Sequence, residues 1–434
     1  MFTRLSRIAK IGAALSLIIA LSASPTYAEA NLGLPLGDAE SLGLSQEKLD
    51  AIPKALSGFI DKNQVPGFVT VVAKEGKIVH FEAFGKRDVE RDKPMEKDTI
   101  FRMYSMTKPV TGTAVMILVQ EGKLSVDDLV SKYIPEFKNL TVLETKADGS
   151  TEIVPADKPI TIKQLLTHTS GLSYFFIESP VTELYGESDH NDPGISLEEY
   201  AKRVAKLPLI AHPGTAWNYS ISMDILGRVV EVISGQRYGD FLDERIFKPL
   251  KMKDAGFFVQ ESEVDRFAAN YAPTPKKDGM TLVDDPVNSA YLTLPGLDAG
   301  GAGLLCTASD YLRFAQMLLN GGELDGVRIL KEESVREMTS DQLDPALGKS
   351  PLGALIPVMV EGIGFGYTGA VIREGYTTTA FGGAGQYTWG GAASTDFWID
   401  KENDLVGLIC TQLMPSGTYM QRFTFHNAVY AAVK

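Results

Sequence analysis

The sequence predicts an α/β protein of the α+β kind, with a central antiparallel sheet flanked by N- and C-terminal helices and a mostly helical inserted domain. The first observation is a pair of β-rich runs near the start, at residues 67–73 and 77–84. The second is the helical spacing of apolar residues through the middle of the chain. The third is the return of β-rich runs in the last third. Strands at both ends with helices between them favour one sheet built from the two ends of the chain.

These patterns divide the chain into three parts. Residues 1–28 are expected to be a signal peptide. Residues 29–108 and 300–434 are expected to form a discontinuous α/β sheet domain, and residues 109–299 a mostly helical domain. We expect the active site to lie between these two domains.

The start of the chain has the pattern of an export signal. Basic residues precede a short apolar core at residues 11–23, and small residues allow cleavage near Ala28 or Ala30. The core is too short for a membrane-spanning helix, which needs about 20 apolar residues. The sequence therefore predicts a periplasmic or secreted protein with no stable membrane anchor after the signal is cleaved.

Composition limits the partners of this protein. The 434 residues carry a formal net charge of −13, and loss of residues 1–28 removes three positive charges and no negative ones. An acidic chain without Lys/Arg clusters is a poor partner for nucleic acid. Cys306 and Cys410 lie in apolar surroundings and are expected to be buried free thiols, although the compartment permits a disulfide. No Cys/His cluster has metal-ligand spacing, so neither a metal nor a cofactor is expected, and nothing indicates the oligomeric state.

The elements can be placed in order along the chain. Ser45 is expected to cap a helix that runs to about Lys62, and a hairpin follows it across residues 74–76. Another helix begins at Ser105 and ends near Gly122. The remaining expected helices are 161–170, 196–207, 223–234, 308–319 and a closing helix from 422, and the remaining strands are 364–372, 386–399 and 405–412.

Ser105 and Lys108 stand three positions apart at the head of a helix, so their side chains share one helix face. Pro109 fits the first turn, because the first four amides of a helix have no intrahelical partner. A serine hydroxyl becomes a good nucleophile when a neighbouring group takes its proton, and a lysine amine can take part in that transfer. Ser-x-x-Lys also occurs by chance, so the pair alone does not establish a catalytic site.

Two other segments strengthen the catalytic interpretation. Tyr219 lies just before a helix, and a phenolate stabilised by a nearby ammonium can accept the proton of a serine. Gly390 and Gly391 lie within a β-rich run, where they leave room for another backbone or a ligand to approach closely.

Four stretches of the chain resemble the serine β-lactamase superfamily in its class C-like branch, which includes DD-peptidases and family VIII carboxylesterases. They are "FRMYSMTKPVTG" from residue 101, "ITIKQLLTHTSGL" from 160, "HPGTAWNYS" from 212 and "GGAGLLCTASDYLRFAQMLLNGG" from 300. The similarity spans about residues 45–434, and it implies a β-lactamase/transpeptidase-like fold.

The resemblance also implies roles for individual residues. Ser105 is the expected nucleophile, Lys108 and Tyr219 share the general base and acid duties, and the backbone N–H groups of Ser105 and Ala392 form the oxyanion hole. The residues expected to bind the substrate are Trp389, Gly390, Gly391, Ile221, Tyr104 and His212.

Two departures from the β-lactamase pattern bear on the substrate. β-Lactamases carry Tyr-x-Asn where residues 219–221 are Tyr-Ser-Ile, and Lys-Thr-Gly where residues 389–391 are Trp-Gly-Gly. The chain thus lacks an amide that helps to hold a substrate amide and a cation that meets a substrate carboxylate; an indole offers one N–H donor and an apolar face instead. Because Trp-Gly-Gly also resembles the family VIII esterases, the sequence predicts a carboxylesterase for uncharged esters of short to medium acyl chains.

Other signals are weaker. Residues 364–369 fit G-x-G-x-x-G but lie within a β-rich run, so no nucleotide site is predicted, and no G-x-S-x-G elbow occurs. His168 is expected to be a structural hydrogen-bonding residue, and Trp217 a packing residue. Residues 174–194 form a polar-aromatic loop that is either a lid or a surface insertion.

Three alternatives to a hydrolytic esterase stay open at this point. One is a class C-type β-lactamase or DD-peptidase, and the second is an acyltransferase whose acyl-enzyme is taken by an alcohol other than water. The third is a catalytically silent binding protein, although such a protein has no need of Ser105, Lys108 and Tyr219 together.

Overall fold

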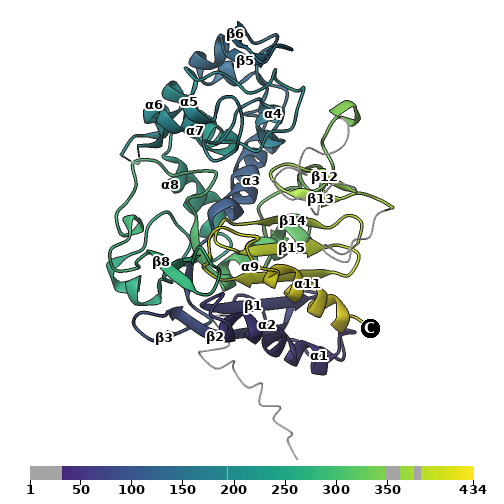
Figure 1. Ribbon diagram of the computed structural model, residues 1–434. Helices are drawn as coiled ribbons and strands as arrows, with labels where there is room; N and C mark the ends of the chain where they lie inside the picture. The colour runs from purple at the N-terminus through teal and green to yellow at the C-terminus, as the bar shows by residue number, and fades with distance from the viewer. Residues whose placement is uncertain (1–31, 193, 348–361, 376–382) are drawn as a thin grey trace, which may run out of the picture.

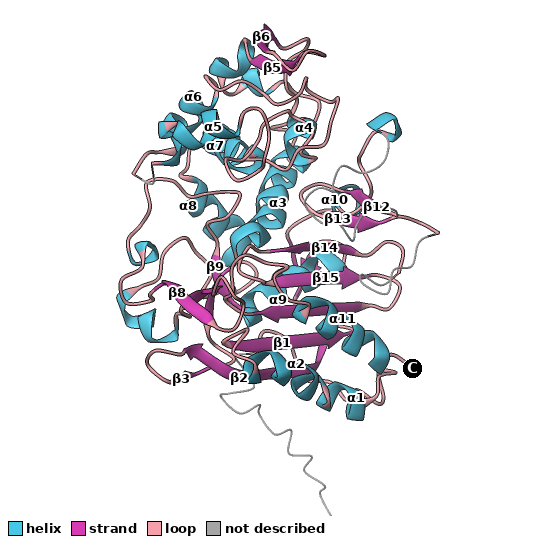
Figure 2. Ribbon diagram, in the orientation of Figure 1, coloured by secondary structure: helices cyan, strands magenta, loops and turns pink. Residues whose placement is uncertain are grey.

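The computed structural model describes residues 32–192, 194–347, 362–375 and 383–434 (Figure 1). The described chain forms a central antiparallel sheet with helices packed on it and a mostly helical part beside it (Figure 2). The predicted fold class is confirmed. The expected signal peptide lies outside the described residues. In the described part of the chain, no helix is both long and apolar enough to cross a membrane.

The two ends of the chain build the central sheet together. Its strand order is β12-β13-β14-β15-β16-β1-β2-β3, and each neighbouring pair is antiparallel. β1 pairs with β16, which places Val69 opposite Cys410. The strands are β1 (Gly67–Lys74), β2 (Lys77–Asp88), β3 (Lys93–Pro94), β12 (Ile363–Phe365), β13 (Ala370–Ile372), β14 (Tyr387–Gly390), β15 (Asp396–Asp400) and β16 (Leu405–Cys410).

Helices cover both faces of this sheet. Successive side chains of a strand point to opposite faces, and β1 shows this directly. Phe68 and Val72 join one apolar cluster with residues of α2 (Ile52–Asp61) and α11 (Gln421–Ala432). Val69 and Val71 join the other, larger cluster, which includes residues of α3 (Thr107–Gln120) and α9 (Ala308–Leu319).

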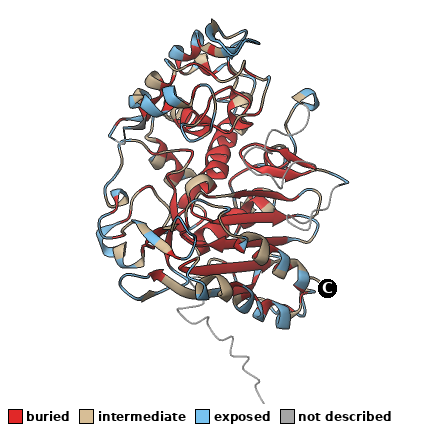
Figure 3. Ribbon diagram, viewed as in Figure 1, coloured by how far each residue is buried: buried red, intermediate tan, exposed pale blue. Residues whose placement is uncertain are grey.

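The helix that follows the Ser-x-x-Lys segment runs through the centre of the molecule. All residues of α3 from Thr107 to Leu118 are buried, and Figure 3 shows the helix buried along most of its length. A helix that is buried on every side needs no polar face. In Figure 1, α3 leads from the sheet toward α4, α6 and α7, so its N-terminal end lies where the sheet and the helical part meet.

The remaining elements complete the architecture. The described chain also has four short strand pairs, which are β4–β9, β5–β6, β7–β8 and β10–β11. The helices are α1 (Gln46–Asp50), α4 (Ile162–Leu166), α5 (Thr182–Glu187), α6 (Leu197–Val204), α7 (Ser222–Ser234), α8 (Tyr238–Leu242) and α10 (Glu332–Met338), with the single turn η2 (Tyr104–Met106). The short strands are β4 (Ile100–Arg102), β5 (Thr141–Thr145), β6 (Thr151–Pro155), β7 (Asn270–Pro273), β8 (Met280–Asp284), β9 (Leu305–Thr307), β10 (Glu323–Leu324) and β11 (Val327–Arg328).

Four expected elements differ from the structure. Of the helix expected at 161–170, only Ile162–Leu166 is helical, as α4. The helix capped by Ser45 is interrupted at Ala51, and α2 then restarts with Pro53 in its first turn, where a missing N–H costs little. Residues 364–372 and 386–399 were each expected to be one strand, but each forms an antiparallel hairpin, β12–β13 and β14–β15. Each run contains a stretch of glycine and small or polar residues, 366–369 and 391–395, which was assigned to the strand and in fact forms the turn. Cys306 and Cys410 are buried free thiols.

Candidate active site

Ser105 lies in the turn η2, between the end of β4 and the start of α3. The fully buried Arg102, at the end of β4, anchors the chain just before this turn. Its guanidinium lies 3.9 Å from the ring centroid of Phe267, and its Nε is 2.7 Å from Asp284. The backbone at Tyr104 has a φ of 44°, in the left-handed region that residues other than glycine seldom adopt. Such strained residues cluster at active sites, where the surrounding structure holds them in place.

The structure brings Ser105, Lys108 and Tyr219 together. The Tyr219 hydroxyl donates to Ser105 Oγ at 2.6 Å, and Lys108 Nζ donates to the same oxygen at 3.1 Å. The amine also lies 4.6 Å from the centroid of the Tyr219 ring. Ser105 is half-buried, so a substrate can reach its hydroxyl, whereas Lys108 is fully buried. The three groups are close enough to exchange one proton.

Lys108 is held by two more partners. Its Nζ donates to the carbonyl oxygen of Gly301 at 2.7 Å and to the hydroxyl of Tyr174 at 3.1 Å. An ammonium has three N–H donors, and the three acceptors here are Ser105, Tyr174 and Gly301. The lysine is therefore fixed in one orientation, with one donor directed at the nucleophile.

Aromatic rings fix the position of Tyr219. Its ring centroid lies 4.9 Å from that of His168, 5.2 Å from Tyr174 and 5.6 Å from Trp389. The buried His168 accepts the backbone N–H of Ser220 at Nδ1, over 3.3 Å. Burial, and then the charge of Lys108, hold the pKa of His168 well below its usual range. A neutral imidazole that accepts a backbone N–H acts as a support for the neighbouring Tyr219, in line with the structural role expected for it.

The end of β14 lies against the nucleophile turn. The ring of Trp389 contacts that of Phe365 as well as that of Tyr219, with centroids 5.3 Å apart. A Cβ atom on Gly391 would collide with the carbonyl oxygen of Met103, so only glycine allows these two backbones to approach so closely. Among the described residues, no hydrogen bond is formed by the N–H of Ala392, the next residue in sequence.

Protein atoms lie close to Gly390 and Gly391 on the side where a Cβ would stand. On Gly390 a Cβ would collide with the guanidinium of Arg422, which pairs with the buried carboxylate of Asp396. On Gly391 it would collide with the Met103 carbonyl described above. These glycines thus let Arg422 and the nucleophile turn pack against the strand, which is the close approach expected for them; their contact with substrate stays a prediction.

Phenylalanines border the site on the solvent side. Phe176 stacks on Tyr174 with centroids 4.6 Å apart and an interplanar angle of 21°, and Phe175 packs edge-on against Phe176. The two phenylalanines are 49% and 57% exposed, which is unusual for rings of this size beside a reactive group. We call Tyr174, Phe175 and Phe176 the aromatic rim. It forms the first part of the 174–194 segment, which continues into α5.

The other expected substrate-binding residues lie at the edge of this cluster or outside it. Tyr104 adjoins the nucleophile, and its hydroxyl accepts an N–H from Asn270 at 3.2 Å. Ile221 is buried at the start of α7. His212 is placed elsewhere: its Nε2 is 2.8 Å from Glu144 of β5, and its Nδ1 accepts the backbone N–H of Asp157. These two partners hold the imidazole beside the β5–β6 hairpin, and the expected contact of His212 with substrate stays a prediction.

Sequence reasoning did not select Tyr174 or Asp224. Tyr174 was included only as part of a loop, because a tyrosine in a polar-aromatic segment carries no spacing signal. Asp224 was overlooked within an otherwise apolar helix pattern, where it is the one acidic residue in the first turn of α7. An acidic residue at a position where the apolar helix pattern predicts burial is the signal that could have identified Asp224.

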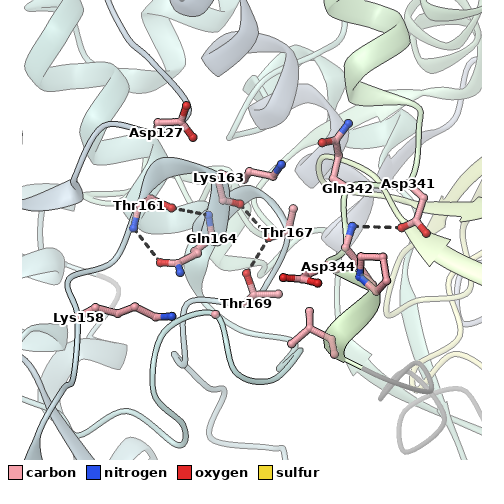
Figure 4. A pocket seen from close by; sticks show the side chains of 14 residues that line it. Asp127, Lys158, Thr161, Lys163, Gln164, Thr167, Thr169, Asp341, Gln342 and Asp344 are labelled. Atoms are coloured by element: carbon pink, nitrogen blue, oxygen red, sulfur yellow. Dashed lines mark hydrogen bonds between the residues drawn. The ribbon is translucent and has the colours of Figure 1, made fainter.

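A separate polar cavity of about 570 Å³ lies between α4 and residues 341–347. Figure 4 shows the side chains that line it, including Lys158, Lys163 and Asp344, and the hydrogen bonds between Thr161 and Gln164 that cap α4. Neither Ser105, Lys108 nor Tyr219 lines this cavity. Within the described residues, no group of three or more His, Cys, Asp or Glu side chains is arranged to hold a metal ion.

A half-buried serine bonded to both a buried lysine and a tyrosine hydroxyl, at the junction of a sheet and a helical part, is the site of a serine hydrolase. The chain belongs to the beta-lactamase family, whose model matches residues 52–430. The resemblance stated from the sequence motifs is confirmed.

One relative and one solved structure with described activities support the same class, and a second relative matches most of the chain. The chain is 32% identical to esterase EstB of Burkholderia gladioli over 412 residues, and this alignment covers 91% of this chain and 96% of that protein. It is 37% identical over 372 residues to protein Rv1367c of Mycobacterium tuberculosis, covering 85% of this chain and 90% of that one. Among solved structures it resembles EstCE1, a hydrolase with promiscuous acyltransferase activity, at 26% identity and a TM-score of 0.73 over 89% of this chain and 99% of that chain.

Proposed function

We propose that this protein is a carboxylesterase that cleaves uncharged esters of short to medium acyl chains through an acyl-enzyme on Ser105. The observation that carries the proposal is the hydrogen-bonded contact of Ser105 Oγ with both Lys108 Nζ and the Tyr219 hydroxyl. Relatives described as esterases make this chemistry the first choice.

The reaction follows from this geometry. The Lys108–Tyr219 pair acts as the base in the state in which it has lost one proton: as Ser105 Oγ attacks the ester carbonyl carbon, the pair takes up the serine proton. The bond from carbon to the alcohol oxygen then breaks, and the pair returns the proton to the departing alcohol. Water next attacks the acyl carbon and gives one proton to the pair, the bond to Oγ breaks, and Oγ recovers its proton as the acid leaves.

The oxyanion of each tetrahedral intermediate needs hydrogen-bond donors. We assign this role to the backbone N–H groups of Ser105 and Ala392, because β14 holds Ala392 next to the nucleophile turn. Removing one such donor from a hydrolase raises the barrier by about 3–4 kcal/mol.

The walls of the site favour an uncharged substrate. Trp389 lies against Tyr219, where the β-lactamase pattern has a lysine, and the aromatic rim adds exposed apolar surface. Lys108, the cation beside Ser105, is buried and already donates to three acceptors. In the described part of the chain, Lys108 therefore has no free donor for a substrate carboxylate beside the nucleophile, whereas an apolar acyl group can pack on the rings.

The location of the activity follows from the sequence. The basic start, short apolar core and small residues near Ala28 and Ala30 lead us to propose export to the periplasm or the exterior. Expression of the full chain, followed by N-terminal sequencing of the protein recovered outside the cytoplasm, tests this proposal.

The decisive experiment for the chemistry compares two substrate classes. We expect the wild type to hydrolyse p-nitrophenyl butyrate much faster than a chromogenic cephalosporin, and a fluorophosphonate probe to label it stoichiometrically. Ser105→Ala should lose both activity and labelling. A clear preference for the cephalosporin would instead indicate a β-lactamase, and an unlabelled, inactive wild type a binding protein.

Acyl transfer is the second candidate function. It is favoured by the exposed rings of Phe175 and Phe176, which give an apolar alcohol a surface on which to bind, and by the activity described for EstCE1. Adding an alcohol to the ester assay and quantifying both products separates the two functions: transfer gives the new ester in excess over the free acid.

A further inference from the structure

Asp224 is a buried carboxylate whose surroundings point to the active-site lysine. It lies in the first turn of α7, five residues after Tyr219, and is 5% exposed. Its Oδ1 accepts the backbone N–H of Gly301 at 3.0 Å. Gly301 is the residue whose carbonyl oxygen accepts the N–H of Lys108 at 2.7 Å. One glycine thus bonds to the carboxylate at one end and to the lysine at the other.

The space around Gly301 shows how closely these groups are packed. A Cβ atom on Gly301 would lie 2.9 Å from Asp224 Oδ2 and 3.0 Å from the hydroxyl of Tyr174. The segment is fixed on its other side by the carbonyl of Gly300, which accepts the hydroxyl of Thr111 at 2.6 Å. A side chain at this position would displace the carboxylate or the phenol.

The ionisable groups that act on Asp224 come from several elements. They are Lys108 of α3, Tyr174 of the aromatic rim, Tyr200 of α6 and Tyr238 of α8. Burial is the largest cause that raises the pKa of each of the three tyrosines, so all three are neutral at neutral pH. Lys108 is therefore the positive charge that faces Asp224 among the described residues.

We propose that Asp224 is a positioning residue that acts as the buried counter-ion of Lys108, with Gly301 as the bridge between them. An isolated charge in a protein interior is strongly unfavourable, and a nearby opposite charge with shared hydrogen bonds offsets much of that cost. Asp224 in this way keeps the amine charged and directed at Ser105. The inference rests on the proposed function, because it explains how that function's lysine is held.

Asp224→Asn tests the proposal, because asparagine keeps an oxygen acceptor for Gly301 and removes only the charge. Asp310→Asn is the matched control. Asp310 is also 5% exposed and accepts backbone N–H groups, those of Lys253 and Asp254, but it does not contact the site. We expect Asp224→Asn to lower kcat for p-nitrophenyl butyrate at pH 8 by about tenfold to a hundredfold with little change in KM, as for other small misplacements of a catalytic group. Asp310→Asn should keep wild-type kinetics.

The pH dependence separates a charge effect from a purely structural one. Burial, the largest cause, raises the pKa of Asp224, so acid neutralises it before an ordinary carboxyl. The ratio of wild-type to Asp224→Asn rates should therefore shrink as the pH falls. A constant ratio, or a variant with wild-type kcat, overturns the proposal.

Two further results keep the test independent of folding and of the proposed function. If Asp224→Asn does not fold, the wild-type rate of fluorophosphonate labelling is measured from pH 8 down to pH 4. A labelling rate that begins to fall at a pH above the range in which an ordinary aspartate titrates supports the proposal. A labelling rate that does not change with pH overturns it. If the wild type is neither labelled nor able to hydrolyse esters, the proposed function itself is contradicted. If the wild type is active and Asp224→Asn is equally active, only the inference about Asp224 is contradicted.

Discussion

At the scale of single residues, the site depends on how the donors of one lysine are distributed. Lys108 Nζ directs one N–H to Ser105 and the other two to Tyr174 and Gly301. A flexible lysine with free rotation would spend little time in this geometry, and holding it in place reduces the entropy lost in reaching the transition state. Tyr174 therefore contributes to the reaction by holding Lys108 in place through one hydrogen bond.

Replacing Tyr174 with phenylalanine separates its hydroxyl from its ring. We expect Tyr174→Phe to lower kcat by about tenfold, since Lys108 loses one acceptor while the ring still stacks on Phe176. Tyr219→Phe, which removes a proton-transfer group, should cost about a hundredfold to ten-thousandfold. Steady-state kinetics with p-nitrophenyl butyrate checks both, and an equal loss in the two variants would assign Tyr174 a direct part in proton transfer.

At the scale of elements, the reactive groups are assembled from parts that are distant in sequence. Ser105 and Lys108 come from η2 and α3, Tyr219 precedes α7, and Trp389 lies in β14. The contact between β14 and the nucleophile turn joins the late strands to the early helix, and it depends on the absence of a side chain at Gly391. The position of the expected oxyanion hole is set by this contact.

A side chain at Gly391 should separate the two backbones. We expect Gly391→Ala to lower the free energy of unfolding by about 1–3 kcal/mol, as for other overpacked sites, and to lower kcat by displacing Ala392. Gly58→Ala in α2 is the control: no atom lies within 4 Å of its added Cβ, and it should be neutral or slightly stabilising. The two variants are compared with the wild type by urea unfolding and by ester kinetics. The prediction is wrong if Gly391→Ala is as stable and as active as the wild type.

The aromatic rim should affect substrate choice more than chemistry. We expect the double variant Phe175→Ser, Phe176→Ser to keep its activity on p-nitrophenyl acetate and to lose about tenfold in kcat/KM on the hexanoate, because longer acyl chains bury more apolar surface on the rings. Met420→Ser, which removes an equally exposed apolar side chain at the start of α11, serves as the control. An equal loss on both esters would show that the rim does not contact the acyl chain.

At the scale of the whole molecule, the sheet joins the two ends of the chain, and this arrangement could be predicted. The β-rich runs at 67–73, 77–84 and 405–412 predicted strands β1, β2 and β16, and helical spacing predicted α7 and α9. The turns that divide 364–372 and 386–399 into hairpins were missed, because the glycine-containing stretches 366–369 and 391–395 were assigned to the strands. The positions of Tyr174, Asp224 and Arg422 depend on contacts between distant segments, which no local pattern records.

Buried carboxylates also set how stability depends on pH. Burial, and then the charge of Asp254, raise the pKa of Asp310 from 3.8 to about 7. Between these two values the folded protein keeps a proton that the unfolded chain has lost, so this group's contribution to stability falls as the pH rises from about 4 to 7. Comparison of Asp310→Asn with the wild type by urea unfolding at pH 5 and pH 8 isolates the contribution. The wild type should lose more stability than the variant over this interval, by a few kcal/mol at most, and parallel behaviour of the two would contradict the assignment.

The central claim is that Ser105 carries the acyl group during turnover. Acid quenching of the protein within one turnover of p-nitrophenyl butyrate, followed by proteolysis and peptide mass spectrometry, tests it most directly. The account predicts one butyryl group on the peptide that contains Ser105 and none on the Ser105→Ala protein. A butyryl group on another side chain, or turnover in Ser105→Ala, would contradict it.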